Sequence, residues 1–474
     1  MTGLWWLAAL TALRLAVAAW TPLSPDEAYY WVWSRALAAG YPDHPPMVAL
    51  FVRAGTSLAG PGVLGVRLLV PVSAAFGSLL LARAGRDLFG RWETGVLAAA
   101  LLNATLLFGV GSVTMTPDTP LLLFWTACVA ALARLVATRD GRWWLAVGMA
   151  AGLALDSKYT AVLLGVSVTA WLLWVPTERR WLATPWPWLA AAVATLIFAP
   201  VLAWNATHRW VSFVRQGGRA TDFAPSKALS FMAELIGGQI GLATPLLALL
   251  FVVGIGWGAR RSWRRDSTAT LLTALTFIPA LVFAQHALGD RVQANWPAIL
   301  YPSAALAAAA MPGWRRWRGP AMALGVGLTA LVWLQGAASP FALPRALDPT
   351  LIRTGGWQAL ASDVADAVRA DHAAFVATDN YGEASLLARL LPPDILVVGA
   401  DPRWALFDLP RAAVAGRTGL LLQSARRGDP PDGAGWATMT RVADLSRSRD
   451  GVVAERYALY RSRAAEDFTA MPRP

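Results

Sequence analysis

The chain has 474 residues, of which 56% are hydrophobic and only 15% are charged. A soluble domain cannot bury so much apolar surface, so the composition predicts a protein whose apolar segments lie in a bilayer. The net charge of +12 does not indicate nucleic-acid binding, because the Arg residues stand in short loops between apolar runs, as topology signals do. The single cysteine, Cys128, lies within an apolar run, which excludes a disulfide framework and a Cys-based metal site.

Apolar runs long enough to cross a bilayer as helices recur along the N-terminal two-thirds of the chain. We predict about eleven spans: 4–21, 62–83, 95–113, 119–137, 143–156, 160–175, 186–204, 236–257, 268–287, 295–311 and 319–338. The first run has Arg14 in its middle and no small-x-small cleavage site after it, so we interpret it as a retained helix rather than a signal peptide.

Tight clusters of Arg stand between alternate spans. They are Arg83, Arg86 and Arg91; Arg134, Arg139 and Arg142; Arg179 and Arg180; Arg260, Arg261, Arg264 and Arg265; and Arg315, Arg316 and Arg318. If the N-terminus is cytoplasmic, every cluster falls on the cytoplasmic side, which is the positive-inside pattern. The same topology predicts three polar segments on the outer side, 22–61, 114–118 and 205–235.

The composition changes after the last span. Charges, Pro and Gly return, and short strand-like runs alternate with helical patterns near 357–371 and 382–391. We therefore predict two domains, a transmembrane domain over 1–339 and a small extracytoplasmic α/β domain over 340–474. The strand-like runs are 374–378, 395–398, 418–423 and 453–461. Within this domain, the segment Asp379-Asn380-Tyr381-Gly382-Glu383 is either a loop that contacts an acceptor or, as we favour, a strand-to-helix turn with a cap.

The first outer segment contains a helix start with an unusual acid. Ser24 is suited to the N-cap and Glu27 to the capping box, so Glu27 is either a capping residue or part of a site. The box does not require Asp26, which the helix dipole keeps ionised. The same helix face carries aromatic side chains, namely Tyr29, Tyr30 and Trp33. An ionised carboxylate beside an aromatic wall suits a general base that acts on a sugar or hydroxyl acceptor.

Three further outer positions carry groups that suit a phosphate or a second acid. Prolines hold His44 in an extended loop, where it either donates to a phosphate or has no special role. In Thr116-Pro117-Asp118 the cap, proline and acid pattern recurs, so Asp118 is either a dipole-matched helix start or a second acid of the site. Lys158 lies between two apolar runs, where it either snorkels to the interface or neutralises a lipid phosphate.

The third outer segment mixes amide, aromatic and cationic side chains. Amides and aromatic faces suit sugars, and Arg suits phosphate. The candidates here are Asn205, His208, Gln216 and Arg219, with Tyr159 beside Lys158. Trp296 opens another span on the outer face, where it either stacks on a sugar or anchors the helix at the interface. No metal-ligand spacing such as His-x-x-x-His occurs, so we predict no metal ligands.

In this order, Asp26-Glu27, Tyr41-Pro42-Asp43-His44-Pro45-Pro46, Thr116-Pro117-Asp118, Lys158-Tyr159, Asn205-x-x-His208-x-Trp210 and Asn295-Trp296-Pro297 resemble bacterial glycosyltransferase family 39. This family belongs to the GT-C membrane glycosyltransferases and includes relatives of protein O-mannosyltransferases and of the aminoarabinose transferase that modifies lipid A. The resemblance covers the N-terminal two-thirds of the chain. The C-terminal domain matches no particular relative, so the acceptor stays open.

The resemblance implies an inverting transfer of a sugar from a polyprenyl-phosphate carrier to a lipid, glycan or protein, at the extracytoplasmic face of a bacterial inner membrane. It implies that Asp26 accepts the proton, with Glu27 beside it and Asp118 as a second acid. It places His44 and Lys158 at the donor phosphate, and we add Arg219. It leaves a divalent ion open.

Two other classes of protein have to be weighed against an enzyme. A transporter or flippase for a lipid-linked sugar would explain the spans and Arg14, but it favours polar or broken helices near the midplane. Here the polar residues gather at one face. A structural scaffold leaves the two acids at capped helix starts, with their aromatic and basic neighbours, unexplained. We therefore place the enzyme first and the transporter second.

Overall fold

The computed structural model describes residues 2–217, 225–428, 433, 435–468 and 470–474. The chain divides into two compact units. The helical unit comprises Met1–Ala18, Ala39–Ala59 and Arg67–Leu331, and the sheet unit comprises Ala19–Ala38, Gly60–Val66 and Val332–Pro474. The first outer segment is thus shared between the units. The predicted domains, 1–339 and 340–474, follow the end of the last span instead and stay a prediction.

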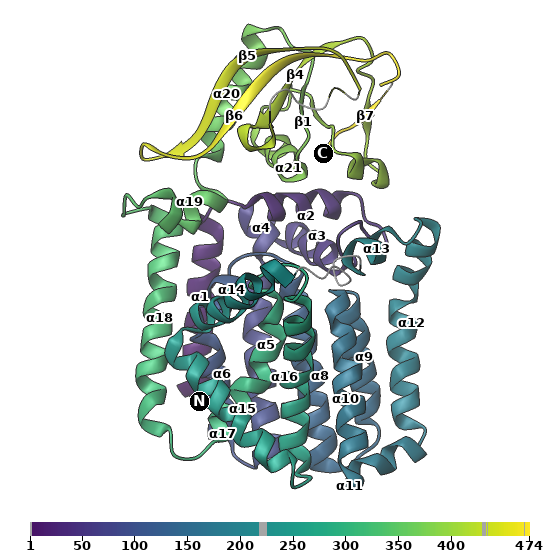
Figure 1. The fold of residues 1–474 in the computed structure, drawn as a ribbon, viewed down its shortest axis with the longest axis vertical. Helices are drawn as coiled ribbons and strands as arrows, with labels where there is room; N and C mark the ends of the chain where they lie inside the picture. The colour runs from purple at the N-terminus through teal and green to yellow at the C-terminus, as the bar shows by residue number, and fades with distance from the viewer. Residues whose placement is uncertain (1, 218–224, 429–432, 434, 469) are drawn as a thin grey trace. The chain divides into compact units, whose positions relative to one another are not determined.

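Long apolar helices build the helical unit (Figure 1). Within the described residues, six helices are long and apolar enough to cross a membrane, or up to eight if each of two bent pairs forms one span. The helices are α1 (Thr2–Trp20), α3 (Met47–Ala59), α5 (Leu69–Phe89), α6 (Trp92–Asn103), α7 (Leu106–Gly111), α8 (Asp118–Thr138), α9 (Trp143–Leu155), α10 (Val162–Trp174), α11 (Pro176–Arg179), α12 (Trp186–Thr207), α13 (Val211–Gly217), α14 (Pro225–Ala243), α15 (Pro245–Ser262), α16 (Ser267–His286), α17 (Tyr301–Ala310) and α18 (Arg315–Ala338). This architecture confirms the predicted polytopic helical protein.

Two predicted spans are each divided between two helices. The run 95–113 is divided into α6 and α7 at Thr105, whose side chain caps α7 by accepting from the Phe108 backbone N–H at 3.2 Å. The run 236–257 is divided into α14 and α15, whose axes differ by 106°. At this bend Thr244 has a φ of 73°, and Pro245 provides no backbone N–H to continue a helix. Hydropathy alone does not detect either break.

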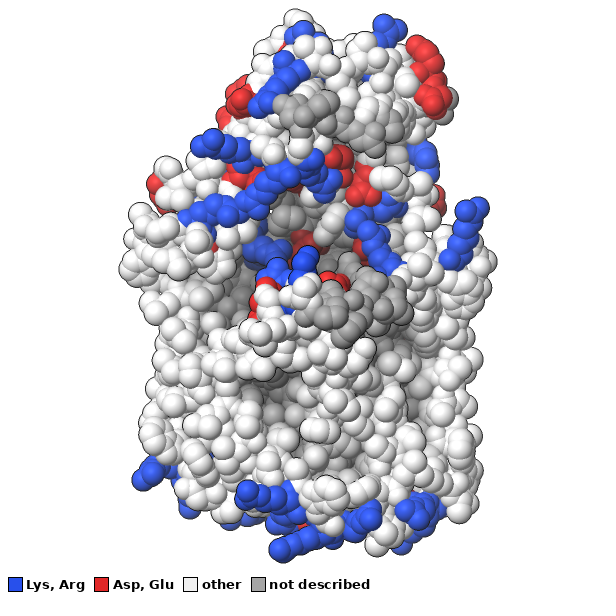
Figure 2. Space-filling model, in the orientation of Figure 1, with Lys and Arg blue, Asp and Glu red and all other residues white. Residues whose placement is uncertain are grey.

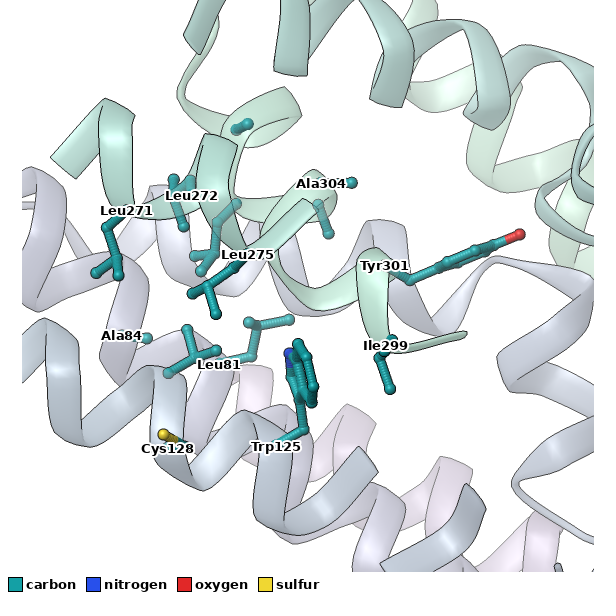
Figure 3. Close-up of a cluster of buried hydrophobic side chains, with 14 of the residues drawn as sticks. Leu81, Ala84, Trp125, Cys128, Leu271, Leu272, Leu275, Ile299, Tyr301 and Ala304 are labelled. Carbon is teal, nitrogen blue, oxygen red and sulfur yellow. The ribbon is translucent and has the colours of Figure 1, made fainter. Parts of the chain in front are cut away.

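Large buried side chains and small residues together form the core of the helical unit. Trp125 and Leu81 lie among buried residues of α5, α8, α16 and α17 (Figure 3). Where α5 crosses α6, a Cβ added to Gly95 would lie 1.9 Å from the Ala82 carbonyl oxygen, so only glycine permits this approach. Close crossings at small residues are the usual way to pack helices in a membrane.

Basic side chains gather at one end of the helical unit, beyond a wide uncharged belt (Figure 2). Ion pairs connect the predicted Arg clusters there. Arg134 at the end of α8 lies 3.3 Å from Asp87 of α5, and Arg139 contacts Glu178 of α11. These pairs bring together the segments of three predicted clusters, at 83–91, 134–142 and 178–180, as the alternation along the sequence predicts.

The sheet unit contains a five-stranded sheet with strand order β2-β1-β4-β6-β5. The strand β1 is parallel to β2 and β4, whereas β6 is antiparallel to β4 and β5. A short antiparallel pair, β3 and β7, accompanies it. The strands are β1 (Val376–Thr378), β2 (Val397–Gly399), β3 (Arg411–Ala412), β4 (Thr418–Ser424), β5 (Trp436–Arg449), β6 (Val452–Ala464) and β7 (Met471–Pro472), and the helices are α2 (Pro25–Arg35), α4 (Val63–Arg67), α19 (Pro349–Thr354), α20 (Trp357–Ala370) and α21 (Tyr381–Leu390).

Most elements of the sheet unit follow the predicted pattern, and the α/β class is confirmed. The strand β5 was not predicted, because it lies at an edge and more than half of its residues are polar. The helix α2 belongs to this unit, and Ala28 joins the core cluster that includes Leu386 and Leu387 of α21. The first outer helix is therefore part of the C-terminal fold.

Candidate functional site

A buried ion pair joins two of the predicted site residues in the helical unit. The Lys158 ammonium donates to Asp118 Oδ1 at 2.7 Å, and the two side chains are only 8% and 10% exposed. Asn295 donates to the other oxygen of Asp118. The ammonium also lies 5.9 Å from the centre of the Trp296 ring. Residues from three distant parts of the sequence thus meet at one buried ion pair.

The start of α8 differs from the prediction. We expected Thr116 to cap this helix with Pro117 at its first position, but α8 begins at Asp118 and has no side-chain cap. The carboxylate of Asp118 instead takes its partners from other elements. Lys158 likewise does not snorkel to the surface, because its ammonium is enclosed.

A second polar cluster in this unit contains Tyr159 and Asn205. Ser212 donates to the Asn205 side-chain oxygen at 2.5 Å and lies 2.6 Å from the Tyr159 hydroxyl. The Tyr159 ring packs at 4.7 Å from Phe213. These contacts connect the 3-10 helix η1 (Tyr159–Ala161) with α12 and α13. They therefore hold the third outer segment next to Tyr159, the residue that follows Lys158. The sequence did not single out Ser212.

The loop that carries His44 lies against the same segments. Gln216 donates to the Asp43 backbone oxygen at 2.7 Å, and Arg215 lies 3.3 Å from the Asp43 carboxylate. The Met47 N–H donates to the backbone oxygen of Asp156 at 3.0 Å. His44 itself is half-buried. The loop is therefore held between α13 and the turn that leads to Lys158.

The His208 side chain contacts the end of α12. Its ring stacks on Trp204 with a centroid distance of 4.1 Å, and its Nδ1 lies 2.8 Å from the Trp204 backbone oxygen. Trp204 in turn lies against Gly40, where an added Cβ would be 2.6 Å from the indole. Asp156 was not predicted. It is half-buried, and its Oδ1 has no hydrogen-bond partner within the part of the chain that the structure describes.

In the sheet unit, Asp26 is held by two residues from the far end of the chain. The Tyr381 hydroxyl donates to Asp26 Oδ1 at 3.1 Å, and an Arg353 nitrogen lies 3.6 Å from Oδ2. The Asp26 side chain stays 40% exposed. The close approach depends on Gly382, where a Cβ would lie 2.6 Å from the Pro25 Cβ. The sequence does not predict this pairing, because 355 positions separate Asp26 from Tyr381.

The capping box predicted beside Asp26 is confirmed. Glu27 is fully buried, and its carboxylate accepts from the Ser24 backbone N–H at 2.9 Å. The cap of α21 is also confirmed, with Asn380 accepting from Gly382 and Glu383. Glu27 therefore has the structural role that the sequence allowed, and a catalytic role for it stays a prediction.

The aromatic wall next to Asp26 is closed rather than open. Tyr29, Tyr30 and Trp33 are at most 8% exposed. Tyr29 packs on Tyr381 at 4.5 Å and, edge to face, on Trp404 at 5.6 Å. Burial of this kind stabilises the sheet unit, and sugar binding by these rings stays a prediction.

Two further predictions concern Arg219 and metal binding. Arg219 lies outside the described residues. Across the residues that the structure does describe, no group of three His, Cys, Asp or Glu side chains is placed to hold a metal ion.

The chain is similar to known proteins, and these similarities agree with the geometry of the site. The family described as dolichyl-phosphate-mannose-protein mannosyltransferase matches residues 43–204. A lipid A galacturonosyltransferase, RgtD, from Rhizobium johnstonii is 28% identical over 283 residues, which is 58% of this chain and 58% of that protein. The chain thus matches little more than half the length of this relative.

Solved structures share the fold. The crystal structure of ArnT from Cupriavidus metallidurans in the apo state covers 97% of this chain and 98% of its own, with a TM-score of 0.59 and 15% identity. The structure of the same protein bound to undecaprenyl phosphate covers 96% of this chain and 98% of its own, with the same score and identity. The resemblance predicted from the motifs, and the GT-C fold, are confirmed.

Proposed function

We propose, from the premise that this chain is a GT-C membrane glycosyltransferase related to family 39, that it transfers a sugar from a polyprenyl-phosphate carrier to an extracytoplasmic acceptor. One observation carries the proposal, namely the enclosed ammonium of Lys158. An ammonium has three N–H donors, and within the described residues one of them is given to Asp118. The remaining donors suit the oxygens of a phosphate.

The buried position decides what this cation can do. Taking an ammonium out of water is costly unless a partner compensates it, and Asp118 supplies that partner. Lys158 and Asn295 occupy both oxygens of Asp118, so we assign Asp118 an orienting role rather than that of a base. Charge that develops on a departing phosphate would be stabilised strongly by a fixed cation in such a dry site.

The proposed reaction is a single displacement. The acceptor hydroxyl oxygen bonds to the anomeric carbon as the bond from that carbon to the phosphate oxygen breaks, and the electron pair leaves with the phosphate. The hydroxyl proton passes to a general base, for which the sequence proposes Asp26. A phosphate is a fair leaving group, so no covalent intermediate is required, and the configuration inverts.

We infer the carrier, the acceptor and the side of the membrane from the similar proteins and from the distribution of Arg. An ArnT with the same fold binds undecaprenyl phosphate, and the matched relative modifies lipid A, so we propose an undecaprenyl-type carrier and a lipid A-like acceptor. The gathering of Arg at one end of the helical unit supports a cytoplasmic location for that end of an inner-membrane protein.

The test is a panel of donors. Purified full-length protein would receive radiolabelled undecaprenyl-phosphate sugars, and nucleotide sugars as a control, with a lipid extract as the acceptor. We expect label to move from one undecaprenyl-phosphate sugar into the extract, with no transfer from nucleotide sugars. Transfer from a nucleotide sugar in the absence of any carrier would contradict the proposal.

A further inference from the structure

A glutamine of α14 links two other parts of the helical unit. The Tyr301 hydroxyl at the start of α17 donates to Gln239 Oε1 at 2.9 Å, and Gln239 Nε2 donates to the Ala294 backbone oxygen at 2.9 Å. A primary amide is both a donor and an acceptor, so this one side chain serves a phenol and a carbonyl at the same time. Gln239 therefore bridges α17 and the turn that precedes Trp296.

The α17 end of this bridge is anchored in the core. Tyr301 is only 6% exposed and belongs to the core cluster of the helical unit. Its ring packs edge to face on Phe251 at a centroid distance of 5.7 Å. The hydroxyl of Tyr301 points away from the other labelled side chains of the cluster (Figure 3). Close packing fixes the ring, so its hydroxyl is a fixed point of attachment for Gln239.

The other end of the bridge lies directly before two residues of the candidate site. Asn295 donates to Asp118, and the centre of the Trp296 ring lies 5.9 Å from the Lys158 ammonium. Ala294 is the residue before Asn295, so a shift of the Ala294 carbonyl would also shift the side-chain amide that Asp118 receives. The bridge thus ends at the backbone that carries this amide.

A second link joins α14 to the same turn, residues 287–295, but it is exposed to solvent. Arg291 lies 2.5 Å from the Glu234 carboxylate, and the two side chains are 65% and 42% exposed. Exposed ion pairs contribute little to stability. Gln239 is half-buried, and its partner Tyr301 is fixed by the core. The glutamine is therefore the stronger of these two links.

We propose that Gln239 is a positioning residue for the transfer reaction. By holding the carbonyl of Ala294, it keeps the Asn295 amide against Asp118, and Asp118 in turn orients the Lys158 ammonium. This places the cation where charge develops on the departing phosphate. The inference rests on the proposed function for the reaction, and on the hydrogen bonds alone for the link between Gln239 and the turn.

The test compares Q239M with E234Q in the full-length protein. Q239M keeps the length of the side chain and removes both hydrogen bonds, whereas E234Q, the control on the same helix, weakens the exposed pair with Arg291. We expect Q239M to lower kcat about three- to tenfold with little change in either KM, which is the factor that corresponds to a lost hydrogen bond. E234Q should transfer sugar as the wild type does. An equal fall in kcat for E234Q, or a rise in KM with kcat unchanged, would overturn the proposal.

A double-mutant cycle separates positioning from a general loss of stability. If Gln239 acts through Asn295, Q239M should change kcat by less than about twofold when N295A is already present. A fall of the same size with and without N295A would show that Gln239 acts by another route, and the proposal would fail.

Hydrogen exchange tests the link without any transfer of sugar. We expect the backbone amides of residues 290–296 to exchange faster in Q239M than in the wild type or E234Q, because the turn has lost its attachment to the core. Unchanged exchange in Q239M would overturn the proposal. Faster exchange in Q239M, together with a wild type that transfers no sugar, would refute the proposed function and leave the link between Gln239 and the turn standing.

Discussion

Asp118 in the helical unit is 10% exposed and receives Lys158 and Asn295, whereas Asp26 in the sheet unit keeps 40% of its side chain exposed and meets a neutral phenol and a guanidinium 3.6 Å away. The first carboxylate is part of a closed, charge-compensated network. The second keeps part of its surface open to solvent. Two acids with the same sequence pattern, a helix start after a proline, thus have different surroundings, and we propose that Asp118 orients a cation whereas Asp26 acts as the base.

The largest expected effect comes from changing Asp26, the more exposed of the two acids. D26N should lower the transfer rate about 10²- to 10⁴-fold, because a general base contributes that much and an amide cannot accept the proton. Its unfolding temperature should match that of the wild type, since Asp26 is not part of the capping box. The assay is single-turnover transfer with saturating donor.

The control for this variant is D363N, which changes an exposed carboxylate of α20 in the same unit. We expect D363N to transfer sugar at the wild-type rate. If D26N also transferred at that rate, the comparison would fail and the base would have to be sought elsewhere.

For the buried pair of Lys158 and Asp118, the first expected effect of a substitution is a loss of stability. K158Q leaves the buried Asp118 carboxylate without its cation and should cost about 3–5 kcal/mol of unfolding free energy. Adding D118N removes the unpaired charge, so the double variant should recover most of that stability while donor binding stays lost. Thermal unfolding in detergent and binding of undecaprenyl phosphate measure the two effects. Donor binding restored in the double variant would refute the phosphate role of Lys158.

A third prediction concerns Glu383, which is buried in the sheet unit. Burial, chiefly, and the charges of Asp379 and Glu455 raise its pKa from 4.5 to about 7, against the effect of Thr378 and Arg427. The folded state therefore holds the proton between these two pH values while the unfolded state has lost it. Stability is thus highest below about pH 4.5 and falls as the pH rises towards 7, by about 3 kcal/mol for this group.

The matched variant is E383Q, which keeps the shape of the side chain and removes the carboxyl group that titrates. We expect E383Q to flatten the fall in unfolding temperature between pH 4.5 and 7 that the wild type shows. An identical pH profile for the two proteins would show that Glu383 does not titrate in this range.

The smallest expected effect concerns the hydrogen bond that holds Asp26. Y381F removes the 3.1 Å hydrogen bond to Asp26 and should lower kcat about three- to tenfold, with little change in either KM. A role in packing alone would lower the unfolding temperature and leave kcat unchanged. Steady-state kinetics with each substrate varied in turn distinguish these outcomes.

Local features could be predicted from the sequence because neighbouring residues determine them. The box of Ser24 and Glu27, the cap at Asn380 and the polytopic architecture all follow from short patterns or hydropathy. Pairings across the chain could not. Asp118 and Lys158 were each predicted for a site, yet each also had a complete local explanation, so nothing in the sequence required them to meet.

Other differences have equally specific causes. The bend at Thr244 lies inside an apolar run that hydropathy treats as uniform. The rings of Tyr29 and Trp33 were predicted as substrate-binding residues. The sequence did not predict that Trp404 and Phe407, more than 370 positions later in the chain, pack on Tyr29. A period of four along α2 shows which face is aromatic and does not show what packs against it.

The central claim is chemical transfer from a lipid carrier, and proteoliposomes test it most directly. Wild-type protein would be reconstituted with undecaprenyl phosphate that carries a radiolabelled sugar, together with a lipid A-like acceptor. The account predicts that label appears on the acceptor and that one undecaprenyl phosphate is released for each sugar transferred. Label that crosses the membrane while still attached to its carrier, with none on the acceptor, would contradict the account and identify a transporter.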